Sequence, residues 1–112
     1  MIVRNASRDL ILGTCVANAG TFSQRLRGLM FRKELAPGEG LVIRPCNSVH
    51  SHFMRFPIDV LFLDRGGRVV HVMPAMRPWK QSPFVRGAVA VLELAAGAAG
   101  ATAPGDLLVM EQ

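Results

Sequence analysis

The chain consists mainly of short apolar or alternating stretches separated by turn-forming residues. Stretches of this kind lie at 2–4, 9–18, 41–44, 48–54, 58–63, 68–73, 88–94 and 107–110. Runs of this length and pattern are typical of β-strands. The pattern therefore predicts about seven or eight short strands. Asp64-Arg65-Gly66-Gly67 predicts a hairpin turn between two of them, because glycine accepts the positive φ that tight turns require.

One segment has helical periodicity instead. Apolar residues recur at i, i+4, i+7 and i+8 from Phe22, which places them on one helical face. Thr21 and Gln24 match a capping box at its start. We therefore predict an amphipathic helix at about 22–31, and a short second helix in the alanine- and glycine-rich stretch near 97–103.

The length of the chain limits it to a simple architecture. A chain of 112 residues has room for one domain with one hydrophobic core, so we expect residues 1–112 to form a single domain. Only one segment is long enough to be a crossover helix, which argues against alternating β-α units. The expected fold is mainly β, at the border with α+β: a β-sandwich or barrel-like sheet with the helix packed on one side.

Charge and hydropathy exclude some partners. The net charge is +5, but no basic run contains interleaved aromatic residues, and we therefore expect no nucleic-acid partner. No apolar stretch approaches the ~20 residues that a membrane-spanning helix needs, so no membrane partner is expected. The apolar run at 10–17 fits a strand better than a signal sequence, since Asp9 precedes it and Gly13 interrupts it. We therefore expect a cytoplasmic protein, with export and the oligomeric state left open.

The stretch 45–64 contains most of the chemically capable side chains. If 48–54 is a strand, side chains two residues apart project from one face, and these include Cys46, Ser48, His50, His52 and Met54. Cys46 and His50 would then lie roughly 13 Å apart, too far for a nucleophile and its base. We assign no catalytic residue and expect a non-enzymatic protein.

Our leading hypothesis is a small-ligand-binding domain. Its polar groove would lie near His50, His52, Arg55 and the proline-rich loop of Trp79, and its ligand would be an anion or a saccharide-like polyol. A metal-binding protein or metal-dependent enzyme is the alternative, in which His50 and His52 hold zinc or copper. A protein-interaction module is a second alternative, based on the basic charge and edge strands.

Asp59 lies inside an apolar run, and we expect it to be a structural anchor. A buried carboxylate without partners is costly. Asp59 would therefore accept backbone N–H groups near the bend at Pro57, or pair with an arginine such as Arg32 or Arg55, which makes Arg32 the second candidate anchor.

Four motifs extend along nearly the whole chain: G-L-M-F-R from Gly28, V-H-S-H-F-M-R-F-P-I-D-V-L-F-L-D from Val49, V-L-E-L-A-A-G from Val91 and P-G-D from Pro104. In this order they resemble the DUF192 family, also called UPF0127. The resemblance implies a compact β-rich domain of about this length.

The family pattern also bears on the candidate site. It maps onto His50, Met54, Asp59 and Asp64, whereas His52 lies at a position that the pattern leaves variable. A site that requires His52 would therefore be particular to this protein or its near relatives. The resemblance carries over no substrate, cofactor or catalytic residue.

Overall fold

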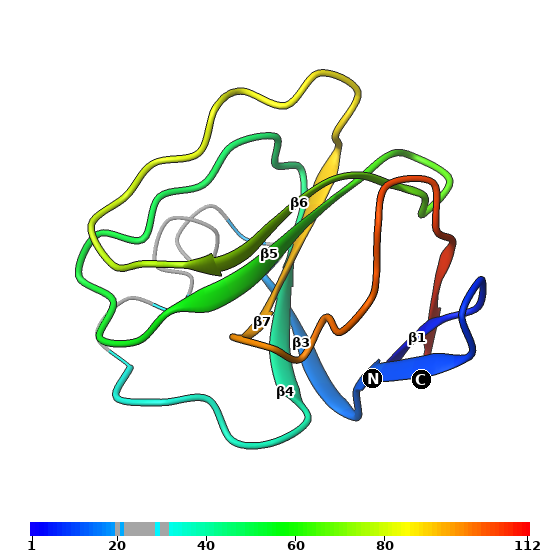
Figure 1. The fold of residues 1–112 in the computed structure, drawn as a ribbon, viewed down its shortest axis with the longest axis horizontal. Coiled ribbons are helices and arrows are strands. Elements are labelled where there is room, and N and C mark those ends of the chain that lie inside the picture. Colours follow the sequence, from blue (N-terminus) through cyan, green and yellow to red (C-terminus); the bar gives the residue numbers. More distant parts are fainter. Residues whose placement is uncertain (20, 22–28, 30–31) are drawn as a thin grey trace.

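The protein is mainly β, as the sequence predicted. The computed structural model describes residues 1–19, 21, 29 and 32–112. Within these residues the chain forms eight strands in two sheets (Figure 1). The strands are β1 (Ile2–Asn5), β2 (Leu10–Gly13), β3 (Cys15–Ala19), β4 (Glu39–Ile43), β5 (Ile58–Leu63), β6 (Val69–Met76), β7 (Ala90–Ala95) and β8 (Leu108–Glu111).

The larger sheet has the strand order β3-β4-β7-β5-β6. The β3–β4 pair is parallel and the other pairs are antiparallel. Strand β5, inside this sheet, is buried along its whole length, which explains its continuous apolar sequence. The hairpin turn predicted at Asp64 connects β5 to β6. There the Asp64 carboxylate accepts the N–H groups of Gly66 and Arg68, both at 2.9 Å.

The smaller sheet, β2-β1-β8, packs against one face of the larger one. Side chains of Leu61, Leu92 and Leu94 on that face share a core cluster with Val3 and Leu108. Strands β1 and β8 pair antiparallel, so the two termini lie side by side (Figure 1). This half of the molecule is a two-layer β-sandwich.

A second apolar cluster covers the opposite face of the larger sheet. It contains Ile58, Val60 and Phe62 of β5 and Val91 of β7. Loop residues such as Met54 pack against it in place of a second sheet. The strands β5 and β7 are therefore buried from both sides.

The stretch 9–18 is two strands and not one. Strand β2 belongs to the smaller sheet and β3 to the larger one, and the chain changes sheet at Thr14. The N–H groups of Thr14 and Cys15 both donate to the Gly38 carbonyl at 2.9 Å, which holds this corner. A Cβ on Gly13 would lie 2.6 Å from Val16 Cγ2, so the corner has no space for a larger residue.

The prediction of a strand at 48–54 was wrong. The segment has one isolated bridge, His50 to Gln81, and no continuous ladder. Phe53 has φ of 64°, and the Met54 N–H donates to the Ser51 carbonyl, which turns the chain. The period-2 face predicted from Cys46 to Met54 therefore does not form.

The short helix predicted near 97–103 was also wrong. This segment is a series of turns, in which the N–H groups of Ala98, Gly100 and Thr102 each donate to the carbonyl three residues earlier. Gly97 and Gly100 have positive φ, which ends helical geometry at each step. The helix predicted at about 22–31 lies outside the described residues except for Leu29.

The barrel-like sheet that the sequence left as an alternative does not form. In the described part of the chain the larger sheet ends at β3 on one side and β6 on the other, and these two strands do not pair with each other. The sheet therefore remains open. No described helix is long and apolar enough to cross a membrane.

Candidate functional site

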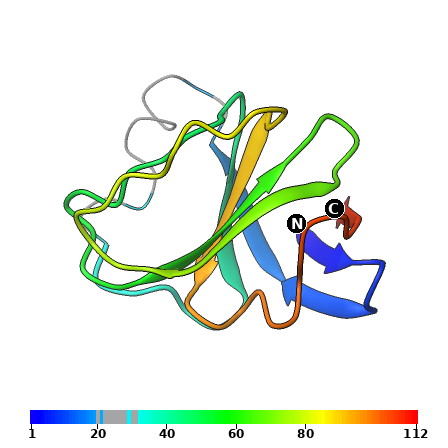
Figure 2. The same ribbon diagram turned by 45° about the horizontal axis from the view of Figure 1, so that its top comes forward.

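Two irregular segments, 46–54 and 77–89, run side by side and form an arm that extends from the larger sheet (Figure 2). Backbone hydrogen bonds hold them together: Cys46 N–H to Val89 O at 3.0 Å, and Val85 N–H to Asn47 O at 2.8 Å. The Ser82 hydroxyl also accepts the Val49 N–H at 2.9 Å. The arm is therefore an ordered structure without a regular ladder.

Ser51 is the centre of the arm. It is fully buried, its hydroxyl donates to the Arg77 carbonyl at 2.5 Å and it accepts the Lys80 N–H at 2.9 Å. Its carbonyl accepts the Trp79 N–H at 3.0 Å. These bonds hold the backbone on both sides of Trp79, which itself has φ of 65°.

Three aromatic rings lie together beside the hydrogen bonds that Ser51 makes with residues 77–80. The Trp79 indole stacks on the His52 ring, with centroids 5.6 Å apart and an interplanar angle of 29°. The Phe53 ring meets the indole edge to face at 4.7 Å. Trp79 is 59% exposed and Phe53 is 47% exposed. We call His52, Phe53 and Trp79 the aromatic platform.

His50 adjoins the platform. Its ring centroid lies 4.9 Å from that of His52, and its Nδ1 accepts the His52 N–H at 3.2 Å. Burial, and then the nearby His52, lower the pKa of His50 below its ordinary value. The imidazole is therefore neutral at neutral pH, with its proton on Nε2.

The structure thus brings together three of the four residues predicted for the ligand site. His50, His52 and Trp79 are neighbours, and Phe53 joins them although the sequence pattern did not single it out. Arg55 is exposed and makes no hydrogen bond or ion pair within the described residues. Phe53 could not be found from a strand pattern, because its position depends on a left-handed backbone.

The two candidate anchors lie apart from each other. The Asp59 carboxylate accepts three backbone N–H groups, from Ala75 at 2.8 Å and from Gly97 and Ala99 at 3.0 Å each. The Arg32 guanidinium donates instead to Glu39, at 2.7 and 2.8 Å. This hydrogen bond is the main cause that lowers the pKa of Glu39.

The predicted zinc or copper ligands remain a pair. Within the described part of the chain, no three His, Cys, Asp or Glu side chains converge on one point. The Cys46 thiol donates to the Ser48 carbonyl at 3.1 Å. A metal ion held by His50 and His52 would therefore need water or a bound molecule to complete its coordination.

Sequence reasoning missed one buried acid, Glu93 on β7. It is 3% exposed, and burial raises its pKa to about 7. The signal was present, since Glu93 lies within an apolar run in the same way as Asp59 does.

The DUF192 family model, described as "Uncharacterized ACR", matches residues 3–110. The UPF0127 protein PH1112 of Pyrococcus horikoshii is 42% identical in an alignment over 86 residues that covers 71% of this chain and 70% of that protein.

Two crystal structures have a similar fold. A protein of unknown function from Novosphingobium aromaticivorans superposes with a TM-score of 0.83 at 26% identity, over 97% of this chain and 82% of that one. A "putative transcription regulator" from Sinorhizobium meliloti superposes with a TM-score of 0.76 at 28% identity, over 96% and 89%. The family match over almost the whole chain shows that this protein belongs to the DUF192 (UPF0127) family.

Proposed function

We propose that this domain is a non-enzymatic binding protein whose ligand is a small saccharide-like polyol, with an acidic saccharide favoured. The single observation that carries the proposal is the exposed aromatic platform on a fixed backbone. A patch of exposed aromatic side chains that contact one another commonly marks a binding site on a protein surface.

The cost of building the platform supports a functional role. Phe53 and Trp79 both have left-handed φ, which costs non-glycine residues of order 1–3 kcal/mol each. Ser51 supplies the hydrogen bonds that maintain this geometry at Trp79. A rigid aromatic surface loses little entropy when a ligand stacks on it.

Charge around the platform favours an anionic group on the ligand. Arg55, Arg77 and Lys80 are all exposed on or beside the arm. The chain as a whole has a net charge of +5, which attracts anions over longer range. A polyol ring on Trp79 with a carboxylate toward these cations would use both features.

Fluorescence titration tests the proposal, because Trp79 is the only tryptophan of the chain. We expect an acidic saccharide such as galacturonic acid to change the emission of Trp79 more strongly than glucose does at equal concentration. The binding that isothermal calorimetry measures should fall at least tenfold in Trp79→Ala.

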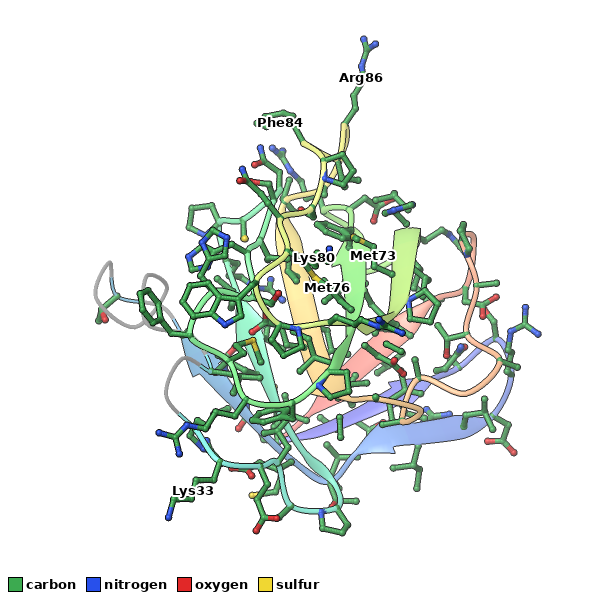
Figure 3. The ribbon with its side chains drawn as sticks, turned by 60° about the vertical axis from the view of Figure 1, so that its left-hand side comes forward. Lys33, Met73, Met76, Lys80, Phe84 and Arg86 are labelled. Atoms are coloured by element: carbon green, nitrogen blue, oxygen red, sulfur yellow. The ribbon has the colours of Figure 1, made fainter. Side chains whose placement is uncertain are left out.

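Phe84→Ala is the matched control. Phe84 is also an exposed aromatic residue of the arm, at 76%, and Figure 3 shows it projecting away from the body of the domain together with Arg86. Binding should be unchanged in this variant. Equal binding by Trp79→Ala and Phe84→Ala, or no response to any neutral or acidic saccharide at 10 mM, refutes the proposal.

Metal binding at His50 and His52 is a second candidate function. The lowered pKa of His50 favours it, since neutral imidazole is the form that binds zinc or copper. Elemental analysis of protein purified without a histidine tag tests it. Retention of added zinc or copper by the wild type but not by His50→Ala supports this function, and no retention by the wild type rejects it.

A further inference from the structure

Glu93 differs from the other buried carboxylates. Among the described residues, three carboxylates are buried: Asp59, Glu93 and Asp106. Asp59 accepts three backbone N–H groups, and Asp106 accepts hydrogen bonds from Asn5, Arg8 and Ala103. The Glu93 carboxyl group makes no hydrogen bond or ion pair with any described residue, although the backbone of Glu93 is paired in the sheet. A buried carboxylate in this condition is costly and calls for an explanation.

The surroundings of Glu93 are apolar. In the sheet it lies opposite Leu41 of β4 and Val60 of β5. It is on the same face as Val91, two residues earlier, and this face carries the apolar cluster that includes Phe62, Met54 and Met76. Glu93 is therefore on the face of the larger sheet against which apolar residues of the arm, such as Met54 and Val85, pack.

The carboxylate is nevertheless not sealed. Within the described residues, no side-chain oxygen or nitrogen is both fully occluded and without a hydrogen-bond partner. Because Glu93 is only 3% exposed and has no such partner, its small remaining exposed area must include the carboxylate oxygens. The carboxyl end of this side chain therefore keeps a trace of accessible surface.

We infer that Glu93 is the recognition group of a second binding site, which takes the protonated amine of a small apolar ligand between the larger sheet and the arm. An ammonium group supplies the charge and the N–H donors that the carboxylate lacks. Phe62 lies diagonally across from Glu93 in the register of β5 and β7 and would add an aromatic side chain near the cation. The alkyl part of the ligand would pack against Leu41 and Met54.

A metal ion fits this position less well than an amine. No group of three or more His, Cys, Asp or Glu side chains converges in the described part of the chain, so Glu93 has no second hard ligand. A neutral hydroxyl would satisfy a hydrogen bond but would leave an ionised carboxylate without a counter-charge. The amine satisfies both requirements.

Thermal-shift and calorimetric titrations with n-hexylamine and 1-hexanol test the inference. At pH 8 we expect the amine to bind the wild type at least tenfold more tightly than the alcohol does, and at least tenfold more tightly than it binds Glu93→Gln. Glu111→Gln is the control, because Glu111 is an exposed carboxylate of β8. Equal affinity of the amine for wild type and Glu93→Gln, or no binding to the wild type at millimolar concentration, overturns the inference.

The pH dependence of the wild type provides a second test that does not require the variant to fold. Amine binding needs the ionised carboxylate, and the pKa of Glu93 is about 7, so affinity should rise about tenfold from pH 6 to pH 8. Other charged or titratable groups on the elements around this face are Glu39, Arg32, His71, Cys46, His50 and Lys80. Burial is the sole cause of the raised pKa of Glu93. An affinity that stays constant over this range contradicts the inference.

This site and the aromatic platform can be tested separately. Trp79→Ala should leave amine binding unchanged, and Glu93→Gln should leave saccharide binding unchanged. If only amine binding fails to depend on Glu93, the site at Glu93 is rejected and the aromatic platform is not. If only saccharide binding fails to depend on Trp79, the platform is rejected and the site at Glu93 is not.

Discussion

Replacing Glu93 by glutamine should change how the stability of this domain depends on pH. Glu93 is buried on β7, and burial alone raises its pKa from 4.5 to about 7. Between these two values the folded protein keeps a proton that the unfolded chain has already released. Stability therefore falls as pH rises through this window, and the loss is complete above about pH 7.

The magnitude follows from the size of the pKa change. At roughly 1.4 kcal/mol per pH unit, raising the pKa from 4.5 to about 7 costs the protein about 3 kcal/mol once Glu93 is ionised. This is a large part of the 5–15 kcal/mol that typically stabilises a domain. Glu93→Gln keeps the shape of the side chain and cannot ionise, so its stability should lack this pH-dependent loss.

Urea unfolding of both proteins at several pH values between about 4.5 and 8 measures the effect. His50 contributes in the opposite sense, since its lowered pKa means that stability is lost as pH falls and the unfolded chain takes up the proton. This contribution is present in both proteins and cancels in the difference. The free energy of unfolding of Glu93→Gln minus that of the wild type should increase by about 3 kcal/mol from pH 4.5 to pH 8. A difference that does not change with pH refutes the reasoning.

Three further predictions concern buried polar groups. Asp59→Ala leaves three backbone N–H groups without their acceptor and should reduce the free energy of unfolding by about 3 kcal/mol or more in urea denaturation. Ser51→Ala removes the hydrogen bonds of the Ser51 hydroxyl with Arg77 and Lys80, which should cost about 1–2 kcal/mol and change the fluorescence of Trp79. An unchanged spectrum would contradict the role of Ser51 in holding Trp79. Hydrogen bonds, that from Asn5 first, lower the pKa of Asp106 from 3.8 to about 2. Acid unfolding of the wild type should therefore lose this stabilisation as pH falls from about 4 to 2, whereas Asp106→Asn should not show this loss.

Local pattern predicted the parts of the fold that depend on neighbouring residues. The apolar run Ile58–Leu63 is the observed strand β5, and the turn at Asp64 forms through that residue's own side chain and the next four residues. Both follow from short-range geometry, namely the burial of a strand on two faces and the φ that glycine permits. The order of the motifs along the chain also identified the family.

The alternation of apolar and polar residues was misleading where hydrogen bonds to distant residues determine the backbone conformation. The stretch 48–54 alternates well, yet Ser51 bonds to Arg77, 26 residues away, and to Lys80, 29 residues away. The partners of this loop are in another loop, so the chain follows their geometry and adopts positive φ at Phe53 and Trp79. No count of apolar positions contains that information.

For the candidate sites, too, the sequence indicated some features and the tertiary structure decided the others. Sequence alone indicated that a carboxylate inside an apolar run must have a structural or chemical reason, which applied to Asp59 and equally to Glu93. Only the tertiary structure showed that Asp59 meets three N–H groups while Glu93 meets none among the described residues. It also brought His52 against Trp79, 27 positions later. Strand content and turns thus follow from local pattern, whereas the contacts that satisfy or expose a polar group depend on segments that fold together from distant parts of the chain.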